Sequence, residues 1–104
     1  MPVFGDLEQA VMDVLWASPT AMSVRDVQAA LAPQRELAYT TVMTVMDRLA
    51  KKGQLTRELD GRAWMYRAAH SWAQLVCDEI ISLLRTGPPE QAKAVLDTVR
   101  ERVG

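Results

Sequence analysis

Residues 38–52 combine hydroxyl, methyl and cationic side chains at a spacing that gathers them on one face of a helix. At about 100° per residue, one face of a predicted helix carries the apolar side chains Val42, Val45, Met46 and Leu49. The opposite face carries Thr40, Thr44, Asp47, Arg48 and Lys51, with Thr41 and Met43 at its flanks. Small polar groups and cations on an outward face suit contacts to base edges and phosphates.

Each type of side chain on this face supports a different contact. Threonine offers a hydroxyl and a methyl group, which can meet bases, phosphates or a thymine methyl, and Met43 can add an apolar contact to that methyl. Arg48 can read a guanine or bind a phosphate. Lys51 and Lys52 lie toward the end of the helix, so we expect them to meet phosphates. The alternative interpretation is a solvated helix face without a ligand.

The charge distribution also indicates a polyanionic partner. The net charge is only −1, yet residues 39–67 carry six basic and three acidic side chains, a local excess of three positive charges. Within this segment, Arg57 and Arg62 fall on a predicted hairpin and are expected to approach the DNA backbone or the minor groove. A solvated basic face is the alternative interpretation of the same pattern.

Catalytic and metal-binding patterns find little support. The single histidine, His70, lies between the predicted hairpin and the next helix, where a capping or packing role is favoured. Asp78 and Glu79 are adjacent, so on a helix they diverge by about 100° and do not suit a shared acid–base site. A thiolate metal site needs more than the single Cys77. We therefore expect no enzyme, no cofactor and no metal site.

Three short helices and a hairpin are predicted to position the outward face. The first helix covers residues 7–17, with Asp6 as N-cap and Gln9 completing a capping box. The second begins after Ser23 and ends at Pro33, and the third covers residues 38–52. Residues 54–67 alternate as strands do, and Asp60-Gly61 suits a two-residue type I′ turn. This order predicts a mainly α fold with a small β-hairpin, a winged helix-turn-helix.

The remaining residues predict two further helices separated by Gly87-Pro88-Pro89. Their wide apolar faces have no other part of the chain to cover them, so a symmetric homodimer is the simplest solution. The residues expected to form that interface are Trp72, Val76, Ile80, Leu83, Leu84, Val95, Leu96 and Val99. We thus expect a DNA-binding domain over residues 1–68 and a helical dimerisation region over residues 69–104.

The sequence also bears on the compartment. No stretch approaches the ~20 apolar residues of a membrane span, and the N-terminus lacks the pattern of a signal peptide. One cysteine cannot form an internal disulfide. A cytoplasmic protein without a membrane partner is expected.

Three stretches of the chain resemble the BlaI/MecI/CopY-type winged-helix repressors. They are Gly5-Asp6-Leu7-Glu8 with the helix that follows, the run from Ala38 to Gly53, and Gly61-Arg62-Ala63-Trp64-Met65-Tyr66. The resemblance implies a homodimeric repressor that binds inverted-repeat operators in double-stranded DNA, with β-lactam-resistance or related stress genes as candidate targets. It also implies that the operator is faced by Thr40, Thr41, Thr44 and Arg48.

The chain departs from the family pattern in its C-terminal helices. The copper-responsive branch has a C-terminal cysteine cluster, which Cys77 alone does not supply. The staphylococcal cleavage dipeptide, Asn-Phe, is absent from the comparable stretch Val95-Leu96-Asp97-Thr98-Val99, so cleavage there stays an open question. A winged-helix module that binds protein instead of DNA is the alternative function, and the basic segment argues against it.

Overall fold

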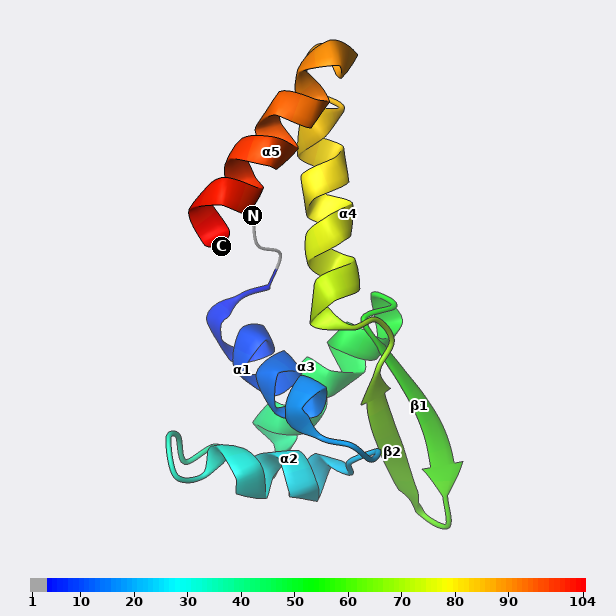
Figure 1. Ribbon diagram of the computed structural model, residues 1–104. Helices are drawn as coiled ribbons and strands as arrows, with labels where there is room; N and C mark the ends of the chain where they lie inside the picture. The colour runs from blue at the N-terminus through cyan, green and yellow to red at the C-terminus, as the bar shows by residue number, and fades with distance from the viewer. Residues whose placement is uncertain (1–3) are drawn as a thin grey trace. The chain divides into compact units, whose positions relative to one another are not determined.

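The computed structural model describes residues 4–104, and the chain separates into two compact units that divide after Ser71 (Figure 1). The first unit contains α1 (Asp6–Ala17), α2 (Val24–Leu31), α3 (Tyr39–Lys51), β1 (Leu55–Asp60) and β2 (Ala63–Ala68). The second contains α4 (Trp72–Leu84), a short 3-10 helix (Pro89–Gln91) and α5 (Ala92–Val103). The predicted mainly helical fold with one hairpin is confirmed.

The N-termini of α1 and α2 are closed by local hydrogen bonds. At α2, which begins after Ser23 as the sequence predicts, Ser23 Oγ accepts from the Asp26 amide and Asp26 Oδ2 accepts from the Ser23 amide, a reciprocal capping box. At α1 the predicted cap was wrong by one residue. The Gly5 amide donates to Glu8 Oε1 at 3.0 Å, so Gly5 precedes the helix and Asp6 is its first residue. The Asp6 carboxylate instead pairs with Arg35 at 3.0 Å.

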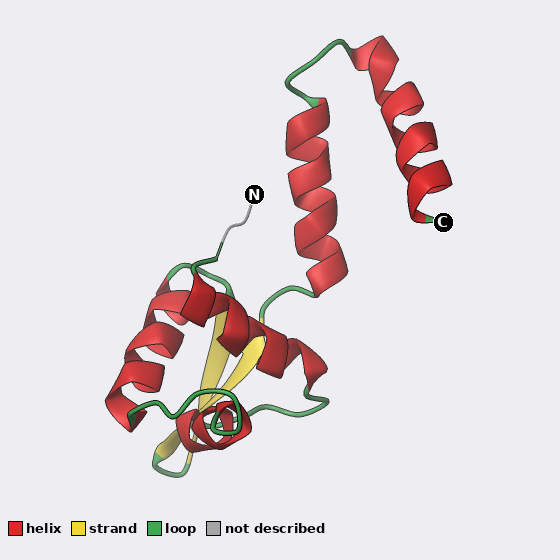
Figure 2. Cartoon of the chain, turned by 90° about the vertical axis from the view of Figure 1, so that its left-hand side faces the viewer, coloured by secondary structure: helices red, strands yellow, loops and turns green. Residues whose placement is uncertain are grey.

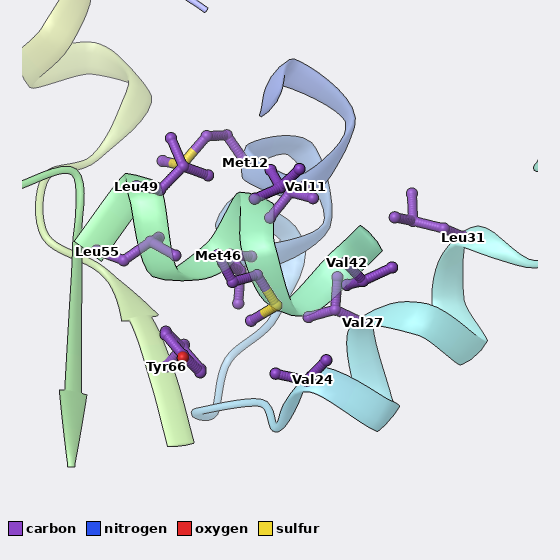
Figure 3. Packing of buried hydrophobic residues seen from close by; sticks show 12 residues of the cluster. Val11, Met12, Val24, Val27, Leu31, Val42, Met46, Leu49, Leu55 and Tyr66 are labelled. Atoms are coloured by element: carbon purple, nitrogen blue, oxygen red, sulfur yellow. The ribbon is translucent and has the colours of Figure 1, made fainter. Parts of the chain in front are cut away.

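One hydrophobic core joins α1, α2 and α3 to the base of the hairpin (Figure 3). Helix α3 supplies the inner face that its periodicity predicts, and it packs against Met12 of α1 and Val27 of α2 within the same cluster. The buried members are Val11, Met12, Leu15, Val24, Val27, Leu31, Val42, Val45, Met46, Leu49, Leu55 and Tyr66. Full burial of each large member contributes about 1.5–3 kcal/mol, so the core fixes the orientation of α3.

The hairpin is anchored at its base and exposed at its tip. Tyr66 of β2 is buried, and it exchanges both backbone hydrogen bonds with Met22, at 2.8 and 2.9 Å. The strands pair from Leu55↔Ala68 to Asp60↔Ala63, so the loop is Gly61-Arg62 and not the predicted Asp60-Gly61. Gly61 has φ +63°, and no other residue but Gly53 among residues 4–104 has positive φ. A type I′ turn needs two such residues, so the predicted turn type was wrong and the geometry matches type II′.

The second unit has no interior of its own. Helices α4 and α5 follow one another, joined by a loop and the short 3-10 helix (Figure 2). No side chain of α4 or α5 is buried in the single chain, although both helices carry apolar faces. Among the residues expected at a dimer interface, Val76, Ile80 and Leu84 are half-buried. The exposed ones are Trp72, Leu83, Val95, Leu96 and Val99.

Candidate nucleic-acid interface

The outward face of α3 is exposed to solvent over most of its length. Every residue expected from the sequence to contact DNA from this helix and its C-terminal cap is exposed, namely Thr40, Thr41, Met43, Thr44, Arg48, Lys51 and Lys52. The opposite face, with Val42 and Met46 fully buried, holds the helix against the core. The backbone therefore cannot rotate this face inward without exposing apolar surface.

The threonines of α3 are not equivalent. Thr44 Oγ1 donates to the carbonyl oxygen of Thr40 at 2.8 Å, which occupies the hydroxyl proton inside the helix. The oxygen lone pairs and the methyl group of Thr44 remain available. In this rotamer Thr44 can accept from an amino group of adenine or cytosine, or contact a thymine methyl.

The cations of α3 fall into two kinds. Lys51 pairs with Asp47 at 3.0 Å, and Lys52 pairs with Glu8 at 3.0 Å, which ties the end of α3 to α1. Arg48 is exposed and has no ion pair or side-chain hydrogen bond within residues 4–104. Arg48 is thus the cation of this helix with the most freedom to meet a ligand.

Two carboxylates are held ionised by these contacts. The pKa of Glu8 lies below its ordinary value of 4.5, first because the Gly5 amide donates to it and then because Lys52 does. The pKa of Asp47 lies below 3.8 because of hydrogen bonds from Lys51 and then Arg57. Both groups carry a full negative charge at neutral pH.

The two arginines expected on the hairpin have different settings. Arg62 lies exposed in the loop, where it can reach a nearby phosphate. Arg57 is half-buried and bound to other side chains of the protein: its Nη1 lies 2.9 Å from Asp47 Oδ1 and 3.2 Å from the Tyr66 hydroxyl. Its guanidinium also lies over the Trp64 ring, 4.9 Å from the centroid. This geometry makes Arg57 the link between the wing and α3, a role that the sequence did not indicate.

The structure also adds two residues that sequence reasoning missed. Arg25, in the first turn of α2, lies 5.2 Å above the ring of Tyr39, the first residue of α3. Both are exposed, and Tyr39 directly precedes Thr40 at the start of the outward face. The position of Arg25 beside the N-cap Ser23 was a usable signal, because the first helix of a helix-turn-helix crosses the DNA backbone.

The remaining chemistry of the described residues is sparse. Residues 4–104 hold no group of three or more His, Cys, Asp or Glu side chains that could bind a metal ion, and Cys77 is a free, exposed thiol. No helix in this part of the chain is both long and apolar enough to cross a membrane.

Helix α2, the turn, helix α3 and the antiparallel hairpin together define a winged helix-turn-helix protein. The family model for the penicillinase repressor matches residues 4–102. The chain therefore belongs to the penicillinase repressor family.

Individual relatives agree with this assignment. The chain is 44% identical over 101 residues to the transcriptional regulator BlaI of Mycobacterium tuberculosis, covering 96% of this chain and 73% of that protein. The solution structure of the DNA-binding domain of the repressor BlaI superposes with a TM-score of 0.61 at 28% identity, over 69% of this chain and 87% of that one. The Bacillus licheniformis BlaI monomer, solved in complex with the blaP half-operator, gives 0.57 at 28% identity with the same coverage.

Proposed function

We propose that the protein is a sequence-specific transcriptional repressor that binds inverted-repeat operators as a homodimer. The observation that carries this proposal is the exposed, threonine-rich and cationic face of α3, set opposite a buried apolar face. The B. licheniformis relative solved with a half-operator supports DNA as the ligand. As a repressor it has no enzymatic step, and it works in the cytoplasm, where operator DNA is accessible.

The contacts divide between base edges and the DNA backbone. Helix α3 enters the major groove, where Thr40, Thr41, Met43 and Thr44 meet bases and Arg48 reads a guanine. Phosphates are met by the exposed cations Arg25, Lys52 and Arg62, while Lys51 is held by Asp47. Arg57 holds the wing in place through its contact with Asp47 of α3.

Dimerisation is assigned to the second unit. Its apolar side chains stay exposed or half-buried in the single chain, which a second copy would cover. A symmetric pair then presents two copies of α3 to half-sites about 34–36 Å apart, one helical turn. The family membership makes β-lactam-resistance or related stress genes the candidate targets.

The proposal is tested by selecting bound duplexes from a random DNA library with the purified protein and sequencing the survivors. We expect enrichment of an inverted repeat whose half-sites lie about one turn apart. Absence of any enrichment with a folded dimer would contradict the proposal and favour a module that binds protein.

A further inference from the structure

Asp47 places a negative charge among the cations that face outward from α3. Its Oδ2 lies 3.0 Å from Lys51 Nζ, and its Oδ1 lies 2.9 Å from Arg57 Nη1. The carboxylate is partly exposed, with 37% of its side chain accessible. An anion at this position opposes a polyanionic ligand, so its presence calls for a physical reason.

The two cations that Asp47 holds differ in how firmly they are kept. Arg57 is only 28% exposed and keeps two further partners, the Tyr66 hydroxyl and the Trp64 ring. Lys51 is 72% exposed, and Asp47 is the one partner that its ammonium group has within residues 4–104. Loss of the Asp47 charge therefore frees Lys51 and leaves Arg57 anchored.

We propose that Asp47 is a specificity-determining residue, which restrains non-specific DNA binding by holding Lys51 in an ion pair. The inference rests on the proposed function, since it concerns how affinity is divided among DNA sequences. Non-specific affinity comes from cations that neutralise phosphates, and Lys51 must leave Asp47 to become one of them. Base contacts by Arg48 and the threonines require no such exchange, so Asp47 weakens random DNA more than the operator.

The test compares a random-sequence duplex with the duplex enriched by selection. Asp47→Asn keeps the side-chain shape and removes the charge. It is expected to tighten binding to the random duplex by about 3–10-fold near 50 mM salt and to steepen the salt slope by about 1 per protomer. Affinity for the selected duplex should rise less, so the preference for the selected over the random duplex becomes smaller.

Glu58→Gln is the matched control. Glu58 is an exposed carboxylate of β1 that has no ion pair within the described residues, so its loss changes the net charge without releasing a cation. Equal gains by the two variants, or equal gains by Asp47→Asn on both duplexes, would overturn the proposal in favour of a general charge effect.

Lys51→Gln completes a double-mutant cycle with Asp47→Asn. Its own effect can be measured even if Asp47→Asn is unstable. Alone, it should weaken binding to the random duplex by less than about 2-fold, because Lys51 is already engaged; combined with Asp47→Asn, it should cancel the gain. A loss of more than about 5-fold from Lys51→Gln alone would overturn the proposal. Failure of the unmodified protein to bind either duplex would contradict the proposed function instead.

Discussion

Arg48 and Lys51 lie on the same outward face of α3 but in different electrostatic settings. Lys51 is paired with Asp47, whereas Arg48 has no such partner in the described part of the chain. A guanidinium without an ion pair in the unbound protein can make two parallel hydrogen bonds to guanine without breaking such a pair first. Arg48 is therefore the side chain to which we assign base reading.

Replacing Arg48 with Ala should weaken binding to the selected duplex by about 1–3 kcal/mol while changing random-duplex affinity by much less. Competition titrations measure the affinity of each variant for the selected duplex and for the random duplex. An equal loss on both would show that Arg48 binds phosphate and does not read a base.

The contacts of Glu8 with the Gly5 amide and with Lys52 give stability a defined pH dependence. Folding lowers the pKa of Glu8, so the contribution of its carboxylate to stability is complete above pH 4.5. This contribution is lost as the pH falls through the lower pKa of the folded state. Glu8→Gln should lower the free energy of unfolding by up to about 1 kcal/mol at pH 7. The difference between the variant and the unmodified protein should shrink below pH 4.5. Urea unfolding between pH 7 and pH 3 measures this difference. Glu36→Gln, at an exposed carboxylate without an ion pair in residues 4–104, is the control and should show no such trend.

The same residues show where sequence reasoning stops. The exposure of Thr40, Thr44 and Arg48 followed from the 3.6-residue period, since four apolar positions had to face the core. The Asp47–Arg57 link joins residues ten positions apart in two different elements, so it depends on tertiary packing. No local pattern could predict that Arg57 would be engaged.

At the scale of elements, the turn after α3 determines where the hairpin begins. Gly53 has φ +81°, a left-handed conformation in which a side chain is strained although the space around it is open. Gly53→Ala should therefore destabilise the first unit by about 1–2 kcal/mol. Thermal unfolding measures this loss of stability. The control is Gly87→Ala, which should be close to neutral because Gly87 has open space around it and no positive φ. Equal effects would contradict a backbone cause.

The hairpin shows how an element can be predicted while its register is not. Alternation of side chains and the Asp60-Gly61 pair correctly placed a hairpin between α3 and α4. The register is set by Tyr66, which is buried in the core and paired with Met22. Since both constraints are tertiary, the sequence placed the loop one residue too early.

At the scale of the whole molecule, the second unit should couple two DNA-reading units. Removing residues 88–104 takes away α5 and its exposed Val95, Leu96 and Val99. We expect the truncated protein to be monomeric at micromolar concentration and to lose affinity for the inverted repeat. The first unit should remain folded, because its core and the residues packed against it extend no further than Ala68.

Light scattering and circular dichroism of the truncated protein measure these two properties. A truncated chain that stays dimeric would contradict the assignment of the interface to both helices. The apolar faces of α4 and α5 could be read from the sequence, but the partner that covers them could not, because a hydrophobic stripe does not specify its complement.

The central claim is that α3 reads the major groove, and methylation interference on the selected duplex tests it most directly. Methylation at guanine N7 marks the major groove, whereas methylation at adenine N3 marks the minor groove. We predict that methylation at guanine N7 interferes with binding in both half-sites. Methylation of the guanine that Arg48 reads should no longer interfere with binding of the Arg48→Ala variant. Interference confined to adenine N3, or unchanged in Arg48→Ala, would contradict the account.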